Sequence, residues 1–301
     1  MKKKVFIDGS EGTTGLRIFE RFESRDDIEL LKIPSELRKD PVEVKKYINE
    51  SDITFLCLPD AAAREAVAMV ENENTIILDT STAHRTEAGW AYGYPELSAA
   101  HREAIRTGKR IAVPGCYATG FITTAYALTA GGILPKDYPV SAFAVSGYSG
   151  GGKKMIAQYQ AQDKEKELSS ARLYALSQSH KHLKEMKAIS GLERTPLFSP
   201  MVTDYYSGMT VSLTFYADML NGRQTPETVR EYLAKHYAGE KFITVQPLGA
   251  EAESGGVLFS SARSGWDGLE IYVTGNEDRI MVTTRFDNLG KGASGAAIQC
   301  M

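Results

Sequence analysis

Cys116 is the strongest candidate nucleophile in this sequence. It stands in the run from Pro114 to Gly120, between an apolar segment at 110–113 that predicts a strand and a segment at 117–128 that predicts a helix. A strand-to-helix turn presents backbone N–H groups, and the positive helix end favours an anion. This setting lowers a thiol pKa and exposes the thiolate. Because most lone cysteines are inert core residues, the interpretation depends on the other motifs.

Two histidines and a glutamate form a candidate acid–base group. His180 and His182 are followed by Glu185, which lies three residues beyond His182 and so within one helical turn of it. A histidine near a carboxylate suits proton transfer close to neutral pH. The His-x-His pattern is also half of a metal site, but no further cysteine or histidine clusters with it, so no metal is predicted.

A glycine- and serine-rich segment, Ser146 to Lys153, follows the predicted strand at 140–145. It is predicted as a loop whose hydroxyl and backbone donors cradle a phosphate or a nicotinamide. Ser146 and Ser149 are the candidate substrate contacts in it, and Gly150 is a candidate cofactor contact. A flexible loop without a ligand is the alternative interpretation.

A second glycine-rich turn follows the first predicted strand, at 4–8, and leads into a predicted helix at 16–22. Such turns let a backbone approach a pyrophosphate and direct helix N–H groups at it. The spacing is G-x-x-G-x-x-G rather than G-x-G-x-x-G, so the motif alone is weak. Its candidate cofactor contacts are Gly9, Ser10, Gly12, Thr13, Thr14 and Gly15.

The end of the second predicted strand, at 28–33, bears on the choice of cofactor. NAD-binding proteins usually place Asp or Glu there for the ribose 2′-hydroxyl, whereas this chain has Ser35, Arg38 and Lys39. A hydroxyl and two cations suit a 2′-phosphate, so NADP(H) is favoured. Glu36 argues mildly against it, and a solvated charged loop is the alternative for Arg38 and Lys39.

The elements around these motifs predict two architectures. In the first part, strands and helices alternate, with apolar runs at 53–58 and 75–78 that are typical of a buried parallel sheet. The prediction is a Rossmann-like, doubly wound α/β domain. From residue 209 onward, alternating strands at 209–216, 270–273 and 280–286, with a helix at 226–236, predict a mostly antiparallel α+β domain. One face of that sheet is expected to pair with another subunit.

Length and composition exclude several classes of function. The chain has 301 residues, enough for two domains, with a net charge of −3, so a nucleic acid partner is not expected. There is no apolar run of membrane length and no signal peptide, so no membrane partner is expected. Three distant cysteines, Cys57, Cys116 and Cys300, predict a reducing, cytoplasmic location, and Cys57, inside an apolar run, is interpreted as a core residue.

Together and in this order, the motifs resemble the N-acetyl-gamma-glutamyl-phosphate reductase family in its shorter form, within the aspartate-semialdehyde dehydrogenase and glyceraldehyde-3-phosphate dehydrogenase superfamily. Two departures are Lys184, where the family pattern has proline, and Thr82-Ala83-His84 before Arg85. The matching segments are the glycine turn at 9–15, 79–85, 92–97, 114–117, 146–152, His180 to Glu185, 199–201 with 208–209, and 286–299.

The resemblance implies an NADPH-dependent reduction of N-acetyl-L-glutamyl 5-phosphate to the 5-semialdehyde, in arginine biosynthesis, through a thioester on Cys116. His180 or His182 is then the acid/base and Glu185 orients it. Arg85 holds substrate carboxylate or phosphate, and Asn288 joins the cofactor contacts. The implied organisation is a nucleotide domain at 1–115, completed by a C-terminal helix at 290–301, and a catalytic and oligomerisation domain at 116–289. A homodimer or homotetramer is expected.

Two alternatives remain at this point. A related acyl-phosphate reductase, with an aminoadipyl or aspartyl substrate, shares the thioester chemistry, although the Pro-Gly-Cys-Tyr and His-x-His-x-x-Glu patterns favour the glutamyl enzyme. A non-catalytic NADP(H)-binding regulator needs the glycine turn but not Cys116, two histidines and Arg85 together, and fold alone does not imply catalysis.

Overall fold

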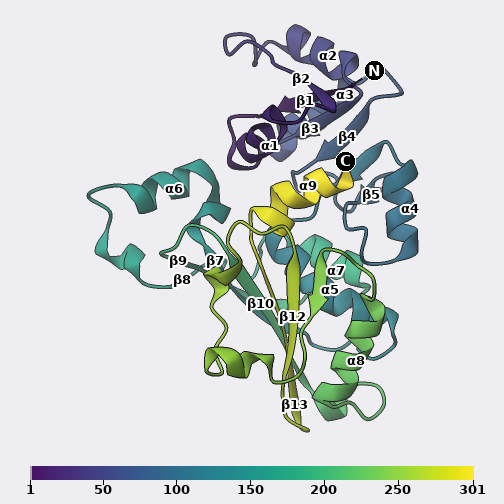
Figure 1. Cartoon of the computed structure of the whole chain (residues 1–301), viewed down its shortest axis with the longest axis vertical. Coiled ribbons are helices and arrows are strands. Elements are labelled where there is room, and N and C mark those ends of the chain that lie inside the picture. The colour runs from purple at the N-terminus through teal and green to yellow at the C-terminus, as the bar shows by residue number, and fades with distance from the viewer. Residues whose placement is uncertain (1) are drawn as a thin grey trace. The chain divides into compact units, whose positions relative to one another are not determined.

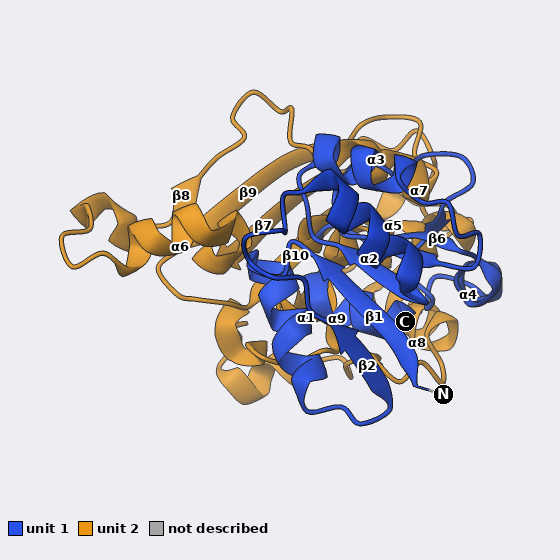
Figure 2. Cartoon of the chain, turned by 90° about the horizontal axis from the view of Figure 1, so that it is seen from above, with its two compact units in different colours: residues 1–115, 293–301 blue, residues 116–292 orange. Residues whose placement is uncertain are grey.

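The computed structural model describes residues 2–301. The chain divides into two compact units, which Figure 2 distinguishes by colour. Unit 1 comprises Met1–Gly115 and Ala293–Met301, and unit 2 comprises Cys116–Gly292. No helix within residues 2–301 combines the length and apolarity that crossing a membrane requires.

Unit 1 is a doubly wound α/β domain (Figure 1), as the sequence predicts. Its six-stranded sheet has the order β2-β1-β3-β4-β6-β5, and all of the pairings are parallel. The strands are β1 (Lys3–Asp8), β2 (Ile28–Leu31), β3 (Ile53–Leu56), β4 (Ile76–Asp79), β5 (Ala91–Tyr92) and β6 (Arg110–Ala112), and the helices are α1 (Thr13–Glu23), α2 (Pro41–Glu50), α3 (Asp60–Ala68), α4 (Ala99–Thr107) and α9 (Gly295–Cys300).

Separate apolar clusters cover the two faces of this sheet. On one face, Ile18 and Phe22 of α1 pack with Ala297 of α9 against strand residues such as Phe55. On the other face, α2 and α3 pack against β1 and β3, as in the cluster that includes Ile48. The strands are therefore buried on both sides, which explains why they are continuous apolar runs rather than alternating patterns.

Unit 2 is an α+β domain built on a seven-stranded mixed sheet of order β11-β12-β13-β10-β7-β9-β8. Strand β10 is antiparallel to both β13 and β7, whereas β7 with β9 and β11 with β12 are parallel. The strands are β7 (Ser141–Gly147), β8 (Arg172–Leu173), β9 (Leu197–Thr203), β10 (Met209–Tyr216), β11 (Ile243–Val245), β12 (Leu269–Gly275) and β13 (Arg279–Phe286), and the helices are α5 (Cys116–Ala130), α6 (Gly152–Gln160), α7 (Leu183–Ser190) and α8 (Pro226–His236).

One face of this sheet is covered by helices, with α5 against β10 and β13 and α8 against β11 and β12. Helix α5 packs so closely that a Cβ added at Gly120 would lie 2.7 Å from both Val211 and Thr284 side-chain atoms. The opposite face exposes Phe143, Leu197 and Tyr216, which alternate with buried neighbours along their strands. The covered face of the sheet therefore holds α5 in place, and part of the opposite face of the sheet has no covering element.

The segment Ser146 to Lys153 is not a loop, so that prediction is wrong. Ser146 and Gly147 end β7, a 3-10 turn spans Tyr148–Gly151, and α6 begins at Gly152. Tyr148 stacks on Tyr159 with 4.7 Å between ring centroids, and this pair belongs to a small apolar core. Its aromatic packing orders a stretch whose glycine content suggested irregular structure.

Candidate active site

Cys116 is the first residue of α5, four residues after the end of β6, so the predicted strand–turn–helix around it is confirmed. Its side chain is partly buried. A Cβ added at Gly292 would lie 2.9 Å from the Cβ of Cys116, so only glycine fits at that position beside the cysteine. The site thus places a sulfur at the positive end of a 15-residue helix.

Both predicted histidines lie against Tyr117, the residue after Cys116. The Tyr117 ring centroid is 5.7 Å from that of His180 and 6.1 Å from that of His182, and the two imidazoles are 4.7 Å apart. Phe198 packs on His180 at 5.3 Å. The structure therefore brings three of the predicted catalytic residues into one cluster around the start of α5.

The two histidines differ in their surroundings. Burial lowers the pKa of His180 to about 4, and the neighbouring Lys181 charge acts in the same direction. The Nδ1 atom of His180 accepts a hydrogen bond from the His182 N–H at 3.1 Å, so neutral His180 carries its proton on Nε2. His182 is 5 % exposed and directly precedes α7. His180 is therefore uncharged at neutral pH.

Glu185 lies in the first turn of α7 and is 2 % exposed. A carboxylate at this end of a helix is favoured by the helix dipole. The backbone N–H of Met186 donates to the His182 carbonyl at 3.0 Å, so His182 and Glu185 belong to the same hydrogen-bonded turn. The sequence predicts that His182 and Glu185 lie within one helical turn, and the structure has this arrangement.

Tyr174 is a site residue that the sequence reasoning missed. Burial raises the pKa of its hydroxyl, and the charge of the Cys116 thiolate acts in the same direction, which places the two groups near each other. Its ring also packs on His180, with centroids 5.8 Å apart. Tyr174 follows the two-residue strand β8, and no motif in the sequence distinguishes it from the other tyrosines.

Four further predicted contacts gather beside the 3-10 turn after β7. Asn288 donates to the Ser149 hydroxyl at 3.0 Å and accepts from the Gly208 N–H at 2.8 Å. A Cβ at Gly150 would lie 3.5 Å from both Asn288 Nδ2 and Ser146 Oγ. Ser146 and Ser149 are each 1 % exposed, so their hydroxyls serve hydrogen bonds within the protein in this structure.

Unit 1 contains a cavity of about 240 Å³ at the glycine turn, and four predicted cofactor contacts line it: Gly9, Ser10, Ser35 and Arg38.

The backbone of the glycine turn has no room for side chains. Gly9 has φ +81°, and a Cβ there would lie 2.4 Å from the Cys57 carbonyl oxygen. A Cβ at Gly15 would lie 2.3 Å from the Gly9 carbonyl oxygen. Gly12 caps α1, which begins at Thr13 and continues through Thr14 and Gly15. This bare backbone at a helix start fits a dinucleotide pyrophosphate.

Arg85 is 8 % exposed, and its guanidinium donates to the carbonyls of Val113 at 2.8 Å and Thr80 at 2.9 Å. Next to it, His84 forms a buried pair with Asp79 at 2.6 Å and stacks on Trp90 with 4.1 Å between centroids. The sequence reasoning missed this pair. It fixes the backbone segment that carries Arg85.

The other two cysteines have structural surroundings. Burial raises the pKa of the Cys57 thiol to about 12, so it stays protonated at neutral pH. Cys300 donates to the Gly93 carbonyl at 3.3 Å from α9. Within residues 2–301 no group of three or more His, Cys, Asp or Glu side chains is arranged to hold a metal ion.

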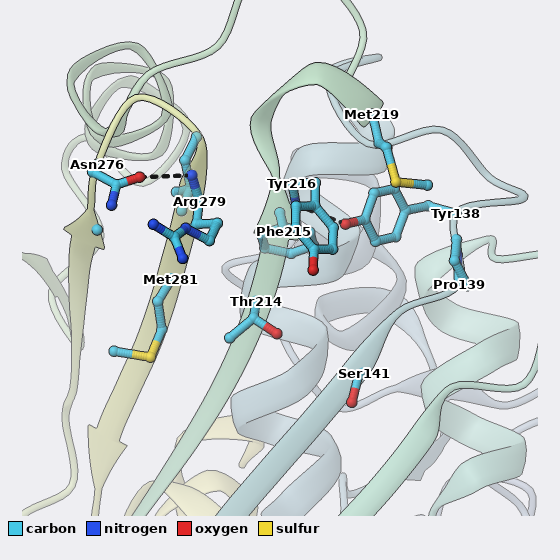
Figure 3. Close-up of a pocket in the computed structure, with 12 residues that line it drawn as sticks. Tyr138, Pro139, Ser141, Thr214, Phe215, Tyr216, Met219, Asn276, Arg279 and Met281 are labelled. Atoms are coloured by element: carbon cyan, nitrogen blue, oxygen red, sulfur yellow. Dashed lines mark hydrogen bonds between the residues drawn. The ribbon is translucent and has the colours of Figure 1, made fainter.

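A second cavity, of about 450 Å³, lies in unit 2 on the uncovered side of the sheet, between β7, β10 and β13 (Figure 3). Its walls are mostly apolar, with Arg279 and Asn276 at one end and Tyr138 and Met219 at the other. The predicted catalytic residues lie elsewhere. This cavity therefore belongs to the uncovered face rather than to the thiol site.

Asp8 lines the unit 1 cavity, and burial raises the pKa of its carboxyl to about 6, which the pH dependence of stability can test without a ligand. An acid with a raised folded-state pKa destabilises the fold as pH rises through the interval from its ordinary value, 3.8, to about 6. We expect Asp8→Asn to stabilise the protein at pH 8 by up to about 3 kcal/mol, at about 1.4 kcal/mol per tenfold change in proton affinity, and to have little effect at pH 3.

Thermal unfolding of the unliganded protein at these two pH values measures the effect, and the exposed Asp26→Asn is the matched control. A gain from Asp8→Asn that is equal at pH 3 and pH 8 would show that the substitution acts through packing rather than charge.

Two family models match the chain: "Semialdehyde dehydrogenase, NAD binding domain" over residues 4–106 and "Semialdehyde dehydrogenase, dimerisation domain" over residues 116–288. Among curated proteins, N-acetyl-gamma-glutamyl-phosphate reductase 2 of Nostoc sp. is 43 % identical over 306 residues, covering 99 % of this chain and 95 % of the relative. The N-acetyl-gamma-glutamyl-phosphate reductase of Rhizobium meliloti is 44 % identical over 305 residues, covering 100 % and 98 %.

Solved structures with the same fold include aspartate semialdehyde dehydrogenases. That of Francisella tularensis superimposes with a TM-score of 0.74 at 15 % identity, covering 99 % of this chain and 98 % of its own. Aspartate semialdehyde dehydrogenase II of Vibrio cholerae gives 0.73 at 15 % identity, covering 100 % and 97 %. At this identity the likeness establishes the fold alone.

Proposed function

The chain belongs to the N-acetyl-gamma-glutamyl-phosphate reductase family of semialdehyde dehydrogenase-type oxidoreductases, and we propose that it reduces N-acetyl-L-glutamyl 5-phosphate to N-acetyl-L-glutamate 5-semialdehyde in arginine biosynthesis. The observation that carries this proposal is the position of Cys116 at the start of α5, with Tyr117, His180 and His182 packed around it. Free, reduced cysteines are consistent with a cytoplasmic enzyme.

The Cys116 thiolate is the nucleophile in this proposal. Its sulfur attacks the acyl carbon, and the bond from that carbon to the phosphate oxygen breaks. Inorganic phosphate departs, and a thioester remains on the enzyme. Reduction of the thioester would use the hydride that a reduced nicotinamide supplies when it is bound. Collapse of the resulting thiohemiacetal releases the aldehyde and restores the thiolate, a good nucleophile and a good leaving group.

A histidine protonates the oxyanion that becomes the thiohemiacetal hydroxyl and removes that proton again on collapse. We assign this role to His182. The pKa of His180, lowered to about 4 by burial, lies far from neutral pH, whereas an acid/base works best when its pKa is near the working pH. Glu185, one helical turn away and buried, orients His182, and His180 holds its backbone through the 3.1 Å bond.

A nicotinamide cofactor follows from the NAD binding domain that residues 4–106 match. We propose NADP(H) specifically, because Ser35, Arg38 and Lys39 line the same cavity as Gly9 and Ser10. A hydroxyl and two cations suit the adenosine 2′-phosphate. Gly12, Thr13, Thr14 and Gly15, at the start of α1, would receive the pyrophosphate. Gly150 and Asn288, in unit 2, are further proposed cofactor contacts.

Arg85, Ser146 and Ser149 are the proposed substrate contacts. Arg85 is a fixed fork of donors, because two carbonyls already hold its guanidinium in place. Ser146 lies at the end of β7 and Ser149 in the 3-10 turn after it, and their hydroxyl groups would be shared with a bound carboxylate or phosphate.

The reverse reaction tests this function: NADP⁺ reduction with N-acetylglutamate 5-semialdehyde, followed by absorbance of the reduced nicotinamide. We expect turnover that requires phosphate. If turnover instead requires the aspartyl or the aminoadipyl semialdehyde, the substrate assignment is wrong while the thioester chemistry stands. Cofactor binding without phosphate-dependent turnover of any of the three would favour a non-catalytic regulator.

Unit 2 carries a dimerisation domain, and the chain forms an oligomer accordingly. We propose a homodimer, or a homotetramer built from it, through the uncovered face of the sheet. There Leu197 is 60 % exposed, Tyr216 59 % and Phe143 40 %, a group of large apolar side chains on adjacent strands. Burying such a patch is a usual source of interface energy.

We expect Leu197→Lys to shift the protein toward monomer, because the substitution places a charge in the proposed interface. Light scattering over a concentration series measures the shift. Leu176→Lys is the matched control, since Leu176 is 74 % exposed but lies between β8 and α7 and outside the sheet. An unchanged mass for Leu197→Lys, or equal effects of both variants, would place the interface elsewhere.

A further inference from the structure

Glu11 and Arg38 form an ion pair in the lining of the cavity at the glycine turn of unit 1. Glu11 lies in the glycine turn after β1, and Arg38 lies in the segment after β2, so two separate elements supply the charges. Both side chains line the cavity, and both remain partly exposed, at 54 % and 41 %. The pair therefore lies where a ligand bound in the cavity would contact it.

The two partners suit different cofactors. In dinucleotide-binding folds a carboxylate after the second strand accepts the ribose 2′-hydroxyl of NAD, whereas an arginine there receives the 2′-phosphate of NADP. Glu11 comes from the glycine turn instead, but its ion pair with Arg38 brings its carboxylate beside the segment after β2. This cavity offers both groups, and in the unliganded protein each neutralises the other. A 2′-phosphate must therefore draw Arg38 away from Glu11 before it gains the full interaction with the guanidinium.

We propose that Glu11 sets the preference between NADPH and NADH by competing with the 2′-phosphate for Arg38 and by offering an acceptor to the 2′-hydroxyl. The inference rests on the proposed binding of a nicotinamide dinucleotide in this cavity. Glu11 is thus a specificity-determining residue rather than part of the pyrophosphate cradle that the glycines form.

The other charges that line the cavity determine how strongly loss of the Glu11 charge affects binding of a 2′-phosphate. Lys39 lines it as a second cation, and Asp8 lines its wall as a second carboxylate. Burial raises the pKa of Asp8 to about 6, so this carboxylate is ionised only above that pH. Removing the Glu11 charge therefore leaves two cations against one carboxylate around an incoming 2′-phosphate.

Calorimetric titration with two adenosine probes tests the inference without involving the nicotinamide or Cys116. Adenosine 2′,5′-bisphosphate carries the 2′-phosphate, and 5′-AMP carries the 2′-hydroxyl. An exposed ion pair changes an equilibrium constant by up to about fivefold, and loss of the carboxylate also removes its repulsion of the phosphate. We expect Glu11→Gln to tighten the bisphosphate about three- to tenfold, and to leave AMP binding unchanged or weaker.

Glu36→Gln is the matched control. It removes the same charge from the segment that carries Arg38, and Glu36 is not among the residues that line the cavity. Equal changes for both probes in Glu11→Gln, or the same change in Glu36→Gln, would overturn the inference. Arg38→Gln separates this result from a failure of the cofactor proposal. If Arg38→Gln does not weaken the bisphosphate, NADP(H) is not held as proposed, whatever Glu11 does.

Discussion

Cys116→Ser is expected to lower phosphate-dependent NADP⁺ reduction by at least about 10³-fold while leaving NADP⁺ binding unchanged. A serine hydroxyl in place of the thiolate is a far weaker nucleophile at neutral pH and a poorer leaving group, so both halves of the thioester sequence suffer. The change removes no packing volume of consequence, since the side chain is only partly buried. Steady-state turnover and a nucleotide titration on the same preparation measure the two quantities.

Cys57→Ala is the matched control for this variant. Burial raises the pKa of the Cys57 thiol to about 12, so this cysteine takes no part in thiolate chemistry, and its variant should keep activity near that of the parent. A fast-reacting thiol should likewise disappear from iodoacetamide labelling only in Cys116→Ser. If Cys116→Ser retained substantial turnover, a different residue would carry the acyl group.

His182→Gln is expected to lower kcat by about 10²- to 10⁴-fold, the usual contribution of a general acid/base. Glutamine keeps much of the volume and a hydrogen-bonding end, so the helix start at Leu183 should survive. The limb of the pH–rate profile that reports this proton transfer should also vanish, which a purely structural defect would not produce. Pre-steady-state or steady-state kinetics between pH 5 and pH 9 measure both effects.

The comparison with His180→Gln decides between the two histidines. Because the pKa of His180 is lowered to about 4, its protonation state does not change over the working pH range. We expect His180→Gln to cost less than His182→Gln and to keep the pH profile of the parent. The reverse order of effects would make His180 the acid/base and His182 its neighbour.

Much of the fold could be predicted from local patterns. The alternating run at 209–216 and the helix predicted at 226–236 coincide with β10 and α8. A strand in a sheet with one covered face and an amphipathic helix each give the apolar residues of the sequence a characteristic spacing. The start of α2 has an equally local cause, because Asp40 is its N-cap and Pro41 its first residue, and the Asp40 carboxylate accepts from the Val42 N–H at 2.9 Å. These signals are encoded by neighbouring residues.

The features that could not be predicted depend on contacts distant in sequence. The turn at Tyr148–Gly151 is ordered by stacking of Tyr148 on Tyr159. Tyr174, which follows the two-residue strand β8, lies near Cys116. Glu11 pairs with Arg38 although a helix and a strand separate them in the sequence. The glycine content at 146–153 suggested a loop because composition does not report such packing. The cofactor turn was recognisable, but the ion pair at its edge was not.

The most direct test of the thioester is to observe it. The protein is incubated with N-acetylglutamate 5-semialdehyde and NADP⁺ without phosphate, quenched in acid, digested and analysed by mass spectrometry. We expect an N-acetylglutamyl group on the peptide that contains Cys116, and we expect phosphate added before the quench to remove it. Turnover without any such adduct, or an adduct on another residue that phosphate removes, would contradict the proposal that Cys116 carries the acyl group.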